Sequence, residues 1–86
     1  MKTYIFDPIS DDALAYARER LQVVTWQDAA ITQVANAEAC IVRTYKMDKA
    51  QIDAMPNLKI IAKHGVGTDN IDIPYAKSKG ILVTNT

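Results

Sequence analysis

Short apolar runs alternate with helical patterns along the chain, and this alternation constrains the fold more than any other feature of the sequence. The short apolar runs predict strands, and helical patterns separate them; the predicted strands are 4–6, 23–26, 39–42, 58–62 and 81–83. Strands that alternate with helices favour a parallel sheet with right-handed crossovers. We therefore expect a three-layer α/β domain with a five-stranded parallel sheet in the order 2-1-3-4-5.

Residues of the types that begin and end helices stand between these runs. Four side chains are expected to cap helix N-termini, namely Ser10, Asp28, Asp48 and Asp72. Gly80 stands just past the last helical pattern, where a left-handed residue often ends a helix. The apolar stripe of the first helix is expected to be Ala13, Leu14, Ala17 and Leu21.

No helical pattern follows the last predicted strand. A parallel strand normally has both faces covered, so we expect incomplete helix cover after the last strand. The uncovered strand should expose apolar surface and an unpaired edge, which favour a homodimer or a larger assembly. This ending also predicts that the chain is a fragment of a longer protein.

The charge balance and the apolar runs exclude several kinds of partner. Ten basic and ten acidic residues give no net charge, and a basic face for nucleic acid is not evident. No apolar run reaches the length of a membrane span. Cys40 is the only cysteine and His64 the only histidine, so neither a disulfide nor a metal site is expected. We expect a cytoplasmic protein without nucleic-acid or membrane partners.

Polar residues follow three of the predicted strands at the edge where open parallel sheets bind ligands. Asp7, then Arg43 and Thr44, and then residues 64–67 are expected to converge there. The guanidinium of Arg43 is a planar fork that fits a carboxylate or a phosphate. Arg43 is explained equally well as a solvated strand-end residue or as an ion-pair partner of Asp7.

Two glycines stand one residue apart at the same edge. Gly65 and Gly67 allow a sharp turn that brings N–H groups close to an anion, although a tight turn alone explains them as well. They do not form a dinucleotide fingerprint, because Asn70 stands where a third small residue is required. His64 is better explained as a surface residue of this edge than as a catalytic one, and Cys40 as an inert core residue.

Residues 58–72, which include Lys63-His64-Gly65-Val66-Gly67-Thr68-Asp69-Asn70, closely resemble a signature of the D-2-hydroxyacid dehydrogenases. Residues 76–86 continue the likeness in register, and Ile41-Val42-Arg43-Thr44 resembles the arginine–hydroxyl element of that family. The likeness is strongest to the phosphoglycerate dehydrogenase branch, and it is clear from Ala39 onward. Before Ala39 the match lies in the pattern of residues more than in their identity.

The resemblance implies a role for this part of the chain in holding a substrate. In that family the region is a flavodoxin-like, N-terminal substrate-binding domain, and residues 1–86 would be a fragment of it. Arg43 and Thr44 would lie near a small 2-hydroxy or 2-oxo acid. The loop that contains Gly65 would receive its carboxylate on the N–H groups of Val66 and Gly67.

The resemblance also implies NAD as the cofactor, with Val66 approaching the nicotinamide. The main cofactor site would lie in a Rossmann domain that is absent from this sequence. The family's catalytic arginine, glutamate and histidine would lie there too, so no catalytic residue is expected in this chain.

The implied activity of the parent protein is hydride transfer between NAD and the CH–OH group of a D-2-hydroxy acid, with 3-phosphoglycerate as the leading candidate. The 86-residue chain alone is expected to be inactive. The alternative is a stand-alone module that binds small acids or associates with itself. A flavodoxin needs a hydroxyl- and glycine-rich loop where Asp7-Pro8-Ile9-Ser10 stands, and a phosphorylation receiver needs an acid at Arg43; both patterns fail.

Overall fold

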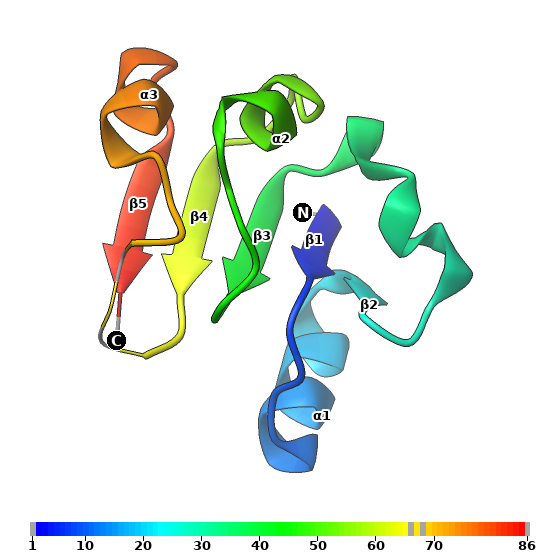
Figure 1. Ribbon diagram of the computed structural model, residues 1–86. Helices are drawn as coiled ribbons and strands as arrows, with labels where there is room; N and C mark the ends of the chain where they lie inside the picture. Colours follow the sequence, from blue (N-terminus) through cyan, green and yellow to red (C-terminus); the bar gives the residue numbers. More distant parts are fainter. Residues whose placement is uncertain (1, 66, 68, 86) are drawn as a thin grey trace.

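The computed structural model describes residues 2–65, 67 and 69–85, which contain a five-stranded parallel sheet (Figure 1). Its strands are β1 Lys2–Ile5, β2 Gln22–Thr25, β3 Ala39–Val42, β4 Ile60–Lys63 and β5 Leu82–Asn85. They lie in the order β2-β1-β3-β4-β5, and every neighbouring pair is parallel. The fold class and strand order predicted from the sequence are therefore confirmed.

Three α-helices connect the strands: α1 Asp11–Arg20, α2 Lys49–Asp53 and α3 Ile73–Ser78. The connection from β1 to β2 leads toward one edge of the sheet, whereas the connections from β2 to β3, β3 to β4 and β4 to β5 lead toward the other edge. Because crossovers between parallel strands are right-handed, α1 lies on one face of the sheet and α2 and α3 lie on the other. Figure 1 shows α2 and α3 as neighbours, with α1 well apart from them. None of the described helices is long and apolar enough to cross a bilayer.

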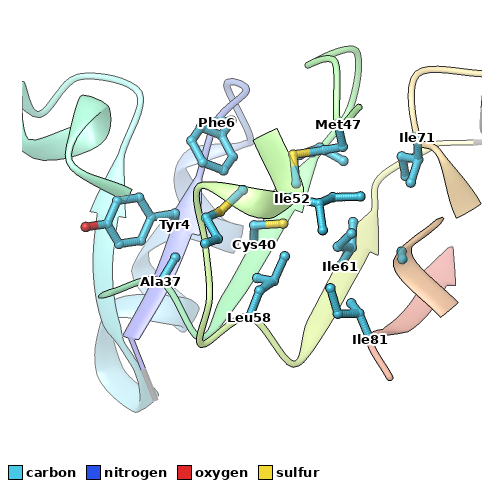
Figure 2. Packing of buried hydrophobic residues seen from close by; sticks show 13 residues of the cluster. Tyr4, Phe6, Ala37, Cys40, Met47, Ile52, Leu58, Ile61, Ile71 and Ile81 are labelled. Atoms are coloured by element: carbon cyan, nitrogen blue, oxygen red, sulfur yellow. The ribbon is translucent and has the colours of Figure 1, made fainter. Parts of the chain in front are cut away.

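The main core lies on the face covered by α2 and α3. Alternate strand residues point into it, and Figure 2 shows Tyr4, Phe6, Cys40 and Ile61 packed there with Met47. Cys40 is fully buried, and burial raises the pKa of its thiol to about 12. The prediction of an inert core cysteine is confirmed, because so little of the reactive thiolate forms near neutral pH.

Local capping signals are confirmed where the cap and its partner lie close in sequence. Ser10, Asp48 and Asp72 each accept the N–H three residues further on, at 3.2, 3.0 and 3.2 Å. Gly80 has a φ of +76°, which is the left-handed conformation predicted after the last helix. These caps set where the connections begin and end.

The α-helix predicted after Asp28 is wrong. That stretch forms two 3-10 segments, η1 Ala29–Thr32 and η2 Val34–Asn36. The carboxylate of Asp28 turns back to bond the end of β2, so it does not cap a helix. The hydroxyl of buried Tyr4 donates to the carbonyl of Gln33, at the junction of the two segments. The Gln33 carbonyl thus accepts its hydrogen bond from a side chain of β1, which stabilises the interruption between η1 and η2.

The face that carries α1 is only partly covered. Of the apolar stripe predicted for the first helix, Ala17 is buried, whereas Ala13 is exposed. Ile41 and Ile60 are half-buried, and Leu82 on β5 is 59% exposed. The incomplete cover predicted beside the last strand is therefore present in the described part of the chain.

Candidate functional site

The ends of β1, β3 and β4 meet at one edge of the sheet. Ile5 pairs with Ile41, and Val42 pairs with Lys63, so the residues that follow these strands become neighbours. The N–H of His64 donates to the carbonyl of Val42 at 2.8 Å, which extends the pairing beyond β4. The convergence predicted from the strand order is observed for the described residues Asp7, Arg43, Thr44 and His64.

Asp7 holds the backbone that follows β3. Its Oδ2 accepts the N–H groups of Arg43, Thr44 and Tyr45 at 2.5, 2.9 and 2.9 Å. Its Oδ1 accepts the hydroxyl of Thr44 at 3.2 Å. A carboxylate has no hydrogen to give, so Thr44 must be the donor and keeps only its lone pairs for a ligand.

The alternative ion pair between Arg43 and Asp7 is not formed. Within residues 2–65, 67 and 69–85, the ion pairs join Arg20 to Glu19 and Lys79 to Asp53. The Asp7 carboxylate is bonded instead to the backbone of residues 43–45, the Arg43 turn, and the Arg43 side chain is exposed. The guanidinium fork is therefore available to an anion from solution.

Two further side chains bind the carbonyl groups of this turn, and sequence reasoning missed both. The ammonium of Lys63 donates to the carbonyl of Arg43, and the side-chain amide of Asn70 donates to the carbonyl of Tyr45 at 2.7 Å. Lys63 is only 7% exposed. A signal existed, because Lys63 stands two residues after Ile61 and so shares its inward face. A buried ammonium needs an acceptor inside the fold.

The aromatic ring of Tyr45 anchors the far end of the turn. It stacks on Phe6 with ring centroids 4.3 Å apart and an interplanar angle of 11°. Both rings line an apolar groove together with Trp26 and Ile31. The turn that carries Arg43 is thus held by polar bonds along its backbone and by stacking at its end.

The glycine loop after β4 leaves open space beside this turn. Gly65 has a φ of +112°, and apart from the glycine and its two chain neighbours no heavy atom lies within 4 Å of a β-carbon placed at Gly65 or Gly67. His64 is exposed at the same edge, as expected for a surface residue. Among the described residues, no three potential metal-ligating side chains gather. Val66 lies outside the described residues, so the contacts expected of it stay predictions.

The hydrogen bonds to Asp7 control its protonation. Burial raises the pKa of this carboxyl, but the N–H groups of Arg43, Tyr45 and Thr44 and the Thr44 hydroxyl together outweigh burial and hold the pKa below 3.8. A carboxyl with a pKa lower in the folded than in the unfolded state stabilises the fold above its unfolded pKa. This contribution is lost as the pH falls through the folded pKa.

We therefore expect Asp7→Asn to destabilise the chain in a pH-dependent way. At pH 7 the free energy of unfolding should fall by about 1–2 kcal/mol, because charged hydrogen bonds become neutral ones in a solvent-accessible place. Urea unfolding at pH 7 and pH 3 measures the difference between the variant and the wild type. The difference should shrink at pH 3. A difference of equal size at both pH values would contradict the claim that the charge of Asp7 stabilises the fold.

Sequence comparison places these features in a known family. A sequence profile for "D-isomer specific 2-hydroxyacid dehydrogenase, catalytic domain" matches residues 3–86. D-3-phosphoglycerate dehydrogenase of Archaeoglobus fulgidus is 42% identical over 91 residues, which cover 99% of this chain and 17% of the relative.

Solved structures show the same fold. A 3-phosphoglycerate dehydrogenase of Entamoeba histolytica with bound NAD+ has a TM-score of 0.82 and 30% identity, over 100% of this chain and 32% of that one. An NADPH-dependent glyoxylate/hydroxypyruvate reductase of Sinorhizobium meliloti, in complex with NADP and malonate, has a TM-score of 0.80 and 30% identity, over 99% and 28% of the two chains. The chain thus spans about a third or less of these relatives. Because the profile extends over nearly every residue, this chain belongs to the D-isomer specific 2-hydroxyacid dehydrogenase family and matches its catalytic domain.

Proposed function

We propose that this chain is the substrate-binding part of an NAD-dependent oxidoreductase that acts on the CH–OH group of a D-2-hydroxy acid. The observation that carries the proposal is the exposed guanidinium of Arg43 beside an open glycine loop. Asp7, which the sequence offers as an ion-pair partner of Arg43, is bonded to the backbone instead. An exposed cationic fork with open space next to it suits the carboxylate of a small acid.

Each group at this edge has a distinct part in holding the acid. Arg43 binds the carboxylate through its fork, and Gly67 in the open loop offers an N–H group to the same anion. Thr44 accepts a hydrogen bond from a hydroxyl of the substrate, because its own hydrogen is donated to Asp7. Val66 is proposed to complete the site with its N–H group and to approach the nicotinamide.

The cofactor is proposed to be NAD, held mainly by a part of the protein beyond this sequence. Relatives are described with bound NAD+ or with NADP. When bound, the nicotinamide accepts the hydride from the hydroxy acid. This chain fits only the reactive end of the cofactor, because there is open space beside Gly65 and Gly67 but the sequence lacks a dinucleotide fingerprint. The chain itself orients the acid group and forms one wall of the cleft.

The leading candidate for the substrate is 3-phosphoglycerate. The Archaeoglobus fulgidus relative named for it is 42% identical to this chain, and the Entamoeba histolytica structure carries the same name. A glyoxylate/hydroxypyruvate reductase is similar in fold as well, so we also propose other small 2-hydroxy acids as candidate substrates.

Binding of a small 2-oxo acid analogue to the purified chain tests the proposal. We expect oxalate to bind, and Arg43→Ala to weaken its binding at least about tenfold, the size of one charged hydrogen bond. Arg43→Lys should recover only part of the affinity, since it keeps the charge but not the fork. NMR titration measures the dissociation constants. Equal affinities for the wild type and both variants would show that Arg43 does not hold the acid.

Self-association is a second proposed property of the chain, and the α1 face supports it. Leu82 is 59% exposed there, and Ile41 and Ile60 are half-buried. Burying this surface against a second copy would remove apolar area from water. Light scattering should detect a dimer or a larger species whose fraction rises with concentration. A monomer at every accessible concentration would contradict this property.

A further inference from the structure

The backbone of the Arg43 turn is bound by side chains from the ends of two other strands and from the loop beyond β4. Asp7 binds the N–H groups of three consecutive residues, Arg43, Thr44 and Tyr45. Lys63 and Asn70 bind two of the carbonyl groups of the same turn. Loops usually move more than the elements they connect, so this number of side-chain bonds to one turn calls for an explanation.

We propose that Asp7 is a positioning residue for substrate binding, which holds the backbone of Arg43 so that its guanidinium meets the acid group at one place. The proposal rests on the function proposed above, because it takes Arg43 as the group that binds the acid. It adds a residue that touches no substrate atom and acts only through the turn.

Asp7 also decides which groups of the turn remain for an anion. Three consecutive N–H groups converge on a single oxygen, Oδ2 of Asp7. Converging N–H groups of this kind bind anions by themselves. Because Asp7 already fills that position, an incoming carboxylate is directed to the guanidinium of Arg43 and to the glycine loop.

Lys63 binds the other peptide group of Arg43. The N–H of Arg43 donates to a carboxylate, and its carbonyl accepts from a buried ammonium. Opposite charges therefore hold the two peptide groups that flank the Arg43 side chain. Fixing both peptide groups restricts the backbone angles of Arg43, so that less backbone entropy is lost when an anion binds its side chain.

The chain offers a matched control for a purely structural role. Asp28 accepts the N–H of Thr25 at 2.8 Å and its hydroxyl at 3.2 Å, the same kinds of bond that Asp7 accepts. Asp28 follows β2, which is separated from β3 by β1 in the sheet. Among the described residues, the side-chain hydrogen bonds of Asp28 reach only Thr25. Removing its charge should cost stability without moving the Arg43 turn.

Oxalate titrations of the wild type, Asp7→Asn and Asp28→Asn test the proposal. We expect Asp7→Asn to bind oxalate about fivefold more weakly, because the backbone of Arg43 must then be ordered on binding. Asp28→Asn should bind within about twofold of the wild type. Asp7→Glu, which keeps the charge, should recover part of the lost affinity. Equal or tighter binding by Asp7→Asn would overturn the proposal.

A second variant keeps the test decisive if Asp7→Asn does not fold. Lys63→Met retains an apolar stem of similar length and removes the donor to the Arg43 carbonyl. It should weaken oxalate binding by about threefold, and unchanged affinity would count against the proposal.

A failure of the proposed function is recognised separately. The wild type would then not bind oxalate, or Arg43→Ala would bind oxalate as tightly as the wild type. In that case the amide heteronuclear NOE values of Thr44 and Tyr45 decide. They should fall in Asp7→Asn and not in Asp28→Asn, and a turn that stays as rigid as in the wild type would refute the positioning role.

Discussion

The parallel register of β1, β3 and β4 is the constraint on which the candidate site depends. It brings the end of β1 beside the end of β3, and it places Lys63 opposite Val42. Asp7 can then satisfy the N–H groups that follow β3, and Lys63 can satisfy the first carbonyl. A shift of one residue in this pairing would turn each strand's side chains to the other face and separate these partners.

The general architecture was predictable because its signals are local. The alternation of strand and helix patterns predicts the parallel sheet, and the strand order β2-β1-β3-β4-β5 is confirmed. Ser10, Asp48 and Asp72 act as caps, as predicted, since each bonds a residue only three positions away. The convergence of Asp7, Arg43 and the glycine loop at one edge follows from the same strand order.

The parts that sequence reasoning missed depend on contacts between distant residues. The helix predicted after Asp28 is broken where Tyr4, on β1, donates its hydroxyl to Gln33. The sequence allows an ion pair between Asp7 and Arg43, but Asp7 bonds the backbone because the sheet places three N–H groups around it. No spacing rule within a strand or a loop contains that information. The burial of Lys63 had a local signal, but its acceptor comes from another strand.

A chimera tests most directly whether this chain is the acid-binding part of a dehydrogenase. The matching segment of the Archaeoglobus fulgidus relative would be replaced by this chain, and oxidation of NADH with 2-oxo acids would be measured. We predict that the chimera turns over and that Arg43→Ala raises KM far more than it lowers kcat. A chimera that folds and binds NADH but reduces no 2-oxo acid would contradict this prediction. So would a chimera whose KM is unchanged by Arg43→Ala.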